Sequence, residues 1–321
     1  MSQTSKKYRL LTRSDLDGLI CAVLIKYLDI VDEIQLIDHP SQMQANEINV
    51  TEEDITTNLP YVPGVHLAID HHVSETLRNR KDPRHVIDPD APSAARVVYN
   101  YYGGSKTFPP FFDEMMTAVD KADSGQFTRD EILHPDGWPL LNFLVDQRTG
   151  IEDWGKFRIS EQQFKLDLID YCMEMRIQEI LEVPDVKERT EIYFTYEKQY
   201  KEQLKARASM VSNIVVLDFR DQPLMYPGNR FIVYALFPDA NISLLIRRDT
   251  DKDQITFSVG KSIINPTSQK NIGEIMLAYG GGGHRAAGAC HVVLEQADAV
   301  YQELIAALTD EPGQQTKKGK F

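Results

Sequence analysis

Between residues 8 and about 125, short apolar runs alternate with helical stretches, and this alternation constrains the fold more than any other feature. Residues 8–15, 33–38 and 65–70 are typical of strands, whereas residues 18–31, 93–104 and 109–123 have helical character. Ser93 is placed to cap the second of these helices, and Gly103 follows its last turn. Strands alternating with helices predict a parallel α/β sheet.

The second half of the chain predicts a smaller α/β domain. Residues 138 to about 210 are mostly helical, and their last part is highly charged. Strands are expected at 213–219, 230–237, 242–249, 254–260 and 290–295, with a helix at 271–279. We therefore expect a catalytic domain at 1–186, a helical linker at 187–210, the smaller domain at 211–309 and a disordered tail at 310–321.

Composition narrows the class of protein. The 321 residues are 42% hydrophobic, enough for a buried core. No apolar run approaches the ~20 residues of a membrane span, and the first residues lack the apolar segment of a secretory signal. Three widely spaced cysteines, Cys21, Cys172 and Cys290, suggest neither a metal site nor disulfides, which favours a reducing cytoplasm. The net charge of −13 disfavours long duplex nucleic acid but not a small phosphorylated ligand.

Acidic residues and histidines follow the expected strands. In a parallel sheet, ligands gather at the carboxyl ends of the strands, where SDLDG and IDHH would lie. The acids and imidazoles near these ends are Asp15, Asp17, Asp38, Asp54, Asp70, His71, His72 and Asp123. Each motif alone is compatible with a solvated turn or a hydrogen-bonded strand end. Their order and placement together favour a metal centre.

The residue types predict the kind of metal. Carboxylates two residues apart suit two cations ~3.5–4 Å apart, each with its own terminal ligand. Mixed oxygen and nitrogen ligands without thiolate favour Mn²⁺, with Mg²⁺ as the alternative, over a structural zinc. Such a pair of cations performs phosphoester hydrolysis.

The smaller domain contains YGGGGHRAAGAC. Four consecutive glycines leave backbone N–H groups able to approach an anion, and a short helix is expected after them. His284 and Arg285 would then contact a phosphate. The alternative is a flexible turn, since glycine mainly provides backbone freedom.

The chain resembles the DHH/DHHA1 phosphoesterase family. The resemblance rests on SDLDG, IDHH, DPDAPSAARVVYNYYG and ADSGQF in the first domain and on GGGGHRAAGA in the second. These motifs occur in the family's order from residue 8 to about 295. The chain is most similar to the branch of nanoRNases, pAp phosphatases and exopolyphosphatase-related proteins.

The resemblance implies roles for individual residues. Asp15 and Asp17 would give one carboxylate to each metal, and His71 and Asp123 would be further ligands. His72 would lie beside the substrate phosphate or the attacking water, and together with Asp70 it is assigned the catalytic role. The smaller domain would bind substrate through Gly280, Gly281, Gly282, Gly283, His284, Arg285 and Lys261.

Three positions depart from the family's pattern. Many relatives have a histidine four residues before the first aspartate, where this chain has Leu11; RecJ-type members also lack it. The bridging aspartate is assigned to Asp54, with Asp38 as the alternative. Lys261 stands near the place where relatives have an arginine, and it would contact phosphate as a point charge.

These observations favour a manganese-dependent hydrolase of short nucleotides such as pGpG, nanoRNA or pAp, working in the cytoplasm without a membrane. The charged linker helix would support a homodimer. Two alternatives remain open: an exopolyphosphatase, and a nucleotide-binding regulator that has lost turnover, for which Leu11 is the motivation.

Overall fold

The structure is a computed structural model that describes residues 6–45, 47–72, 75–76, 82–222, 224–249 and 252–309. The chain forms two compact units, which divide between Thr195 and Tyr196, and each is described by itself. The predicted tail, 310–321, lies outside the described residues.

The first unit is built on a parallel sheet. Its strands, in the order β2-β1-β3-β4-β5, are Val31–Ile37, Tyr8–Arg13, Asp54–Thr57, Leu67–Asp70 and His85–Ile87. All neighbours are parallel, so their carboxyl ends share one edge. The parallel α/β fold is thus confirmed. The short strand β3 was not expected from the sequence, and it sits at the centre of the sheet.

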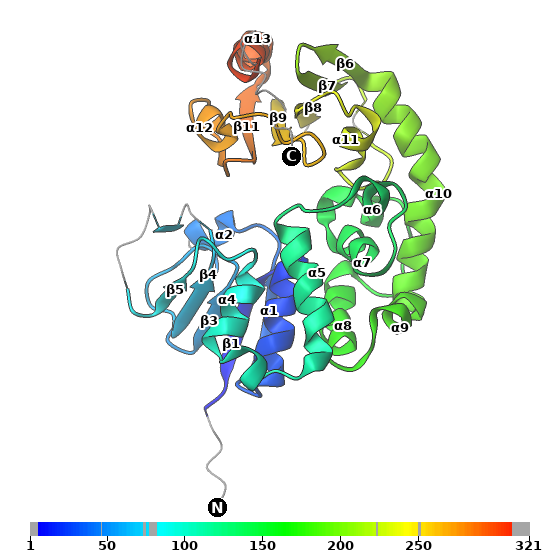
Figure 1. Ribbon diagram of the computed structural model, residues 1–321. Helices are drawn as coiled ribbons and strands as arrows, with labels where there is room; N and C mark the ends of the chain where they lie inside the picture. Colours follow the sequence, from blue (N-terminus) through cyan, green and yellow to red (C-terminus); the bar gives the residue numbers. More distant parts are fainter. Residues whose placement is uncertain are drawn as a thin grey trace, which may run out of the picture. The chain divides into compact units, whose positions relative to one another are not determined.

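Helices cover one face of this sheet. Helix α1 (Leu16–Tyr27) lies against α4 (Ala94–Tyr101) and α5 (Asp113–Asp123), which also contact each other (Figure 1). Residues 16–25 of α1 are all buried, because α8 (Glu161–Glu174) packs on it as well. The other face carries a small apolar cluster that includes Leu11, Ile37, Met43 and Leu59, beside the short helix α2 (Ser41–Gln44).

Further helices follow α5 before the second unit. They are α6 (Arg129–Leu133), α7 (Gly137–Val145), α8, α9 (Ile177–Glu182) and the long α10 (Pro184–Arg207). Helix α10 includes most of the expected linker, 187–210. The helix ends at Arg207, and strand β6 begins at Ala208, before the expected end of the linker. None of the described helices is both long enough and apolar enough to cross a bilayer.

The second unit has a mixed sheet in the order β10-β11-β9-β8-β7-β6. The strands are Gly282–Gly283, Ala287–Val293, Gln254–Lys261, Ile242–Asp249, Ile214–Phe219 and Ala208–Val211. Only β7 and β8 run parallel to each other among these neighbours. Helices α12 (Ile272–Leu277) and α13 (Ala297–Leu308) supply apolar side chains to its core.

The strand expected at 230–237 is wrong. Residues Ile232–Leu236 form helix α11 instead. The side chain of Asn229 accepts a hydrogen bond from the backbone N–H of Phe231 at 3.1 Å and starts the turn. Residues 232–235 are all buried, so the segment has no alternation that would distinguish a strand from a helix.

Candidate metal centre

The first acidic motif lies where β1 passes into α1. Asp15 caps α1 by accepting a hydrogen bond from Gly18 N at 3.1 Å. Gly18 is required here, because a Cβ at this position would lie 1.9 Å from the carbonyl oxygen of Arg13. The first turn of α1 is therefore pressed against the carboxyl end of β1, and this holds Asp15 and Asp17 at the edge of the sheet.

Asp17 is buried and links α1 to α4. Its carboxylate accepts hydrogen bonds from Ala94 N at 2.9 Å and Ala95 N at 2.8 Å, the first N–H groups of α4. Ser93 caps the same helix and accepts a hydrogen bond from Arg96 N, as the sequence predicted. The positive end of a helix dipole thus faces the carboxylate.

His71 directly follows β4 and is oriented as a metal ligand would be. Its Nδ1 donates to the carbonyl oxygen of Ala91 at 3.1 Å, which leaves Nε2 facing two carboxylates. Nε2 lies 3.2 Å from Asp123 Oδ2 and 3.9 Å from Asp17 Oδ2. Asp123 is the last residue of α5.

Asp17, His71 and Asp123 therefore form one potential cation site. Their ligand atoms all lie within 4.8 Å of one another. Burial and then the Asp123 charge raise the pKa of Asp17 to about 8. Burial opposes a charge on His71, but the hydrogen bond to Asp123 and the charge of Asp17 raise its pKa to about 9. Two carboxylates and an imidazole at such short distances suit a divalent cation, because oxygen and nitrogen donors of this kind are its usual ligands.

Asp70 and His72 form a second pair beside this site. His72 Nδ1 donates to Asp70 Oδ1 at 2.7 Å, and both side chains are largely buried. Burial opposes a charge on His72, but this hydrogen bond and the Asp70 carboxylate raise the pKa of the imidazole. The other carboxylate oxygen of Asp70, Oδ2, is buried without a hydrogen-bond partner. An orphaned carboxylate oxygen at this edge is a further observation that fits a cation or a bound water.

The assignment of Asp54 as the bridging ligand is contradicted by the geometry. Asp54 is the first residue of β3, at the amino end, whereas the other acids lie at the carboxyl end. Its carboxylate accepts hydrogen bonds from Arg9 Nε at 2.8 Å, Arg9 Nη2 at 3.0 Å and Thr51 N at 2.6 Å. The acid is therefore a structural anchor between β1 and β3.

The alternative, Asp38, is at the correct end of the sheet but is exposed. It follows β2 and accepts hydrogen bonds from the hydroxyl group of Ser14 and from Gln147 Nε2, the latter at 2.7 Å. It is not among the side chains that cluster with His71. Leu11 is fully buried in the apolar cluster on the sheet face opposite α1, so it has no part in the site.

Two residues at the carboxyl edge were missed by the sequence reasoning. Asn58 directly follows β3 with a positive φ of 55°, and its Nδ2 donates to Asp15 Oδ1 at 3.0 Å. Arg13 ends β1, and its Nε lies 2.9 Å from Asp15 Oδ2. Both residues stand at the end of a strand, and this position was the signal in the sequence that could have found them. Neither is an acid or a histidine, the residue types on which the predicted metal centre rests.

The glycine-rich motif of the second unit differs from the expected phosphate loop. No described helix starts directly after it: α12 precedes it, Gly282–Gly283 form β10, and the next element is β11, with which β10 pairs. A Cβ at Gly281 would lie 2.1 Å from the carbonyl oxygen of Ala289, and one at Gly283 would lie 2.3 Å from that of Ala287. These glycines therefore permit close packing of the hairpin. His284 and Arg285 are exposed at its tip, and Lys261 ends β9.

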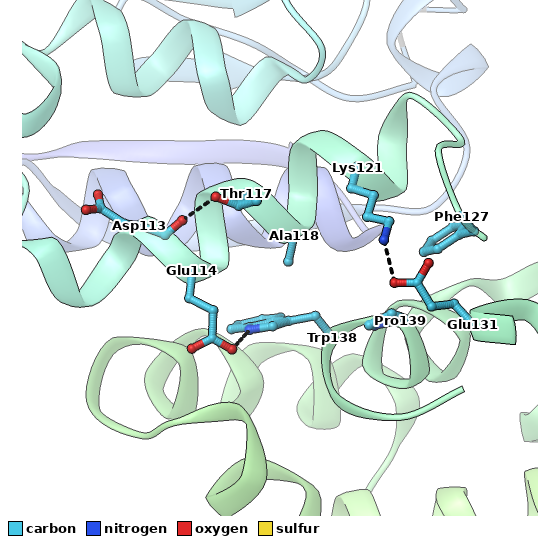
Figure 2. A pocket seen from close by; sticks show the side chains of 9 residues that line it. All are labelled: Asp113, Glu114, Thr117, Ala118, Lys121, Phe127, Glu131, Trp138 and Pro139. Carbon is cyan, nitrogen blue, oxygen red and sulfur yellow. Dashed lines mark hydrogen bonds and ion pairs between the residues drawn. The ribbon is translucent and has the colours of Figure 1, made fainter. Parts of the chain in front are cut away.

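A separate pocket of about 430 Å³ lies along α5 (Figure 2). Trp138 Nε1 donates to Glu114 Oε1 at 3.1 Å on one side, and Lys121 pairs with Glu131 on the other. None of the predicted site residues lines it.

Comparisons with known proteins identify the family. No protein-family model matches the chain. No curated protein matches it either. A solved structure described as PggH, a pGpG-specific phosphodiesterase from Vibrio cholerae, is 52% identical with a TM-score of 0.80, and the match covers 94% of this chain and 99% of that one. A solved DHH domain, from a protein described as belonging to a family of ribosomal proteins, matches in fold, with a TM-score of 0.58 at 11% identity over 95% of this chain and 88% of that one. Together with the motifs, the first match shows that this chain belongs to the DHH/DHHA1 family of phosphoesterases.

Proposed function

We propose that this protein is a Mn²⁺-dependent phosphodiesterase that hydrolyses short 5′-phosphorylated nucleotides, with pGpG as the preferred substrate. The observation that carries the proposal is the arrangement of His71, whose Nδ1 donates to a backbone carbonyl while Nε2 faces Asp17 and Asp123. The similarity to PggH supports the choice of substrate. The oxygen and nitrogen donors, without thiolate, favour Mn²⁺, with Mg²⁺ as the alternative.

In this proposal, Asp17, His71 and Asp123 hold the cation. When bound, the cation polarises the phosphate and lowers the pKa of a water molecule. The helix-terminal N–H groups of Ala94 and Ala95 fix the Asp17 carboxylate, so the site is organised before the substrate arrives.

His72, held by Asp70, is proposed to donate a proton to the leaving group. Hydrolysis forms a bond between the water oxygen and phosphorus and breaks the bond from phosphorus to the 3′ oxygen. The attacking water loses one proton and the leaving 3′ oxygen gains one, so the reaction consumes no net proton. Asp70 fixes the Nδ1 proton of His72 and raises the pKa of the imidazole, so His72 carries a proton that Nε2 can deliver to the leaving oxygen. Asp70 acts here as a positioning residue.

The second unit is proposed to bind the terminal phosphate of the substrate. Because the glycines at 280–283 are largely committed to the hairpin, the side chains of His284, Arg285 and Lys261 supply the positive charge in this proposal. They are carried on adjoining segments, since Lys261 N donates to the carbonyl oxygen of Ala286 at 2.8 Å.

The test is a comparison of substrates on protein stripped of metal and reloaded with Mn²⁺. Products from pGpG, pAp and polyphosphate would be resolved by chromatography, with Asp123→Asn as the matched inactive variant. GMP from pGpG, only with metal, is the expected result. Phosphate release from polyphosphate alone would replace this proposal with an exopolyphosphatase, and bound nucleotide without any product would replace it with a regulator.

We further propose that the protein works in the cytoplasm on small nucleotides, rather than on long duplexes or at a membrane, and that it forms a homodimer. Light scattering of the purified protein tests the mass of the assembly, and a monomeric mass at micromolar concentration would contradict the dimer.

A further inference from the structure

The Asp15 side of the centre differs in charge from the Asp17 side. Asp15 accepts hydrogen bonds from Gly18 N and Asn58 Nδ2 through Oδ1, and it pairs with the Arg13 guanidinium through Oδ2. Both of its oxygens are therefore engaged by donors of this chain, and its charge is offset by an arginine. Asp17 and Asp123, by contrast, share the His71 imidazole, and within the described part of the chain neither forms an ion pair with an arginine.

Asn58 occupies the place where a carboxylate would be expected in a two-cation centre. Thr57 pairs with Ile69 across β3 and β4, so Asn58 stands beside Asp70 at the carboxyl edge. Asn58 is 2% exposed, and its Oδ1 is buried without a hydrogen-bond partner. An amide oxygen can contact a cation or a water, but it supplies no negative charge.

Arg13 is a fixed positive charge at this same edge. Its side chain is 32% exposed and is held through Nε by Asp15, while its two terminal nitrogens have no hydrogen-bond partner among the described residues. A guanidinium with two free N–H edges matches the oxygens of a phosphate.

We propose that the centre holds one resident divalent cation, at Asp17, His71 and Asp123, and that Arg13 takes the place of a second cation by binding a non-bridging oxygen of the substrate phosphate. This inference rests on the proposed function. A second divalent cation beside Arg13 would meet a like charge and a neutral asparagine, where it needs carboxylates. Asn58 and Asp15 act as positioning residues that hold the guanidinium at the edge of the sheet.

The first test counts the cations. Mn²⁺ bound per chain would be measured by elemental analysis and calorimetry, and electron paramagnetic resonance would distinguish an isolated ion from a coupled pair. The expected result is one tightly bound Mn²⁺ per chain with the spectrum of an isolated ion. Two coupled ions in wild-type protein without nucleotide would overturn the proposal, because Asn58 Oδ1 and Asp70 Oδ2 would then be ligands of the second.

The second test removes the guanidinium. Arg13→Gln should keep one Mn²⁺ but bind GMP roughly 10–100-fold more weakly, the effect of losing a charged hydrogen bond. Arg84→Gln, at the amino end of the sheet in an exposed pair with Asp82, is the matched control and should bind GMP normally. Unchanged GMP affinity in Arg13→Gln would refute the role of Arg13.

The third test restores the missing carboxylate. The double variant Arg13→Gln/Asn58→Asp should bind a second Mn²⁺ and show a coupled spectrum, and an unchanged count would contradict the charge argument. Circular dichroism would establish that each variant is folded. These readouts separate the two proposals: wild-type protein that binds one Mn²⁺ and GMP through Arg13 but cleaves no dinucleotide would refute the proposed function alone.

Discussion

Replacing Asp54 by asparagine separates a structural role from a metal-binding one. The Asp54 carboxylate is 2% exposed and accepts two hydrogen bonds from Arg9 and one from Thr51 N. Asparagine keeps the shape and one acceptor oxygen, but it loses the charge and the second acceptor. A hydrogen bond to a charged group contributes ~1.5–3 kcal/mol. Because Arg9 is 28% exposed and can regain water, we expect a loss of about 2–3 kcal/mol for the variant.

The dependence on pH gives this prediction a second signature. Burial alone would raise the pKa of Asp54, but the Arg9 and Thr51 hydrogen bonds lower it below the ordinary value. The carboxylate therefore stabilises the fold fully above about pH 4, its unfolded pKa, and this contribution is lost as the pH falls through the folded-state pKa. The stabilities of wild-type protein and Asp54→Asn should converge in acid.

Urea unfolding at a series of pH values measures the effect, together with the melting temperature. For a unit of this size, the expected loss corresponds to a decrease of about 4–12 °C. Bound Mn²⁺ and turnover should be unchanged, whereas the matched variant Asp123→Asn should lose metal. Asp54→Asn protein with normal stability but without metal would refute the reasoning and restore Asp54 as a ligand.

Four further predictions follow from the same geometry. Asp123→Ala should lower kcat/KM for pGpG by at least about a hundredfold, measured by product chromatography. Ser93→Ala should lower the free energy of unfolding by about 1 kcal/mol in urea, because α4 loses its cap. Gly18→Ala should abolish soluble expression or lower stability by about 3 kcal/mol or more, since its Cβ would overlap the Arg13 carbonyl. Chelation of the metal should lower the melting temperature, and adding Mn²⁺ at about a hundred times its Kd should raise the free energy of unfolding by about 2.7 kcal/mol.

The residues of the proposed cation site that could be predicted are those at the ends of elements with a clear sequence pattern. The strand that ends at Asp70 and the helix that ends at Asp123 have clear patterns, so the last residue of each could be predicted. The parallel sheet then explains why Asp17, after β1, and His71, after β4, lie at one edge. The partners of Asp17 could not be predicted. Ala94 N and Ala95 N lie almost eighty residues further along the chain, and nothing in an alanine pair signals that its backbone will bind a buried carboxylate.

Strand β3 explains the error on Asp54. It has four residues, all buried, with no alternation of apolar and polar side chains, because neighbours cover both of its faces. Without the strand, EEDITTNLP resembles a turn with an available acid. Once the strand is present, its first residue, Asp54, and the residue after its last, Asn58, lie at opposite ends of the sheet. The same segment thus contains both the wrong candidate and the missed one.

The glycine motif shows the opposite limit. Consecutive glycines allow either an anion loop or close backbone packing, and the sequence contains no feature that separates the two. The structure favours packing, because Gly273 N donates to the carbonyl oxygen of His284 at 2.8 Å and a Cβ at Gly273 would lie 2.6 Å from that of Gly283. The hairpin is thereby fixed on α12, and its exposed His284 and Arg285 are presented on a rigid support.

The crowding of charge at the carboxyl edge connects the fold to the chemistry. Asp17 already accepts two hydrogen bonds from the start of α4, yet burial and the neighbouring Asp123 still raise its pKa to about 8. The Cys21 thiol below the site has a pKa raised well above its ordinary value, first by burial and then by Asp17, with Asp15 and Asp70 adding to the effect. Chain folding therefore gathers carboxylates that repel one another, at a cost in stability that the proposed divalent cation would remove. Because the unfolded chain cannot assemble this site, the free energy of cation binding is also free energy of folding. The same acids that limit the stability of the metal-free fold are those we propose to hold the cation, as expected where a site is selected for function.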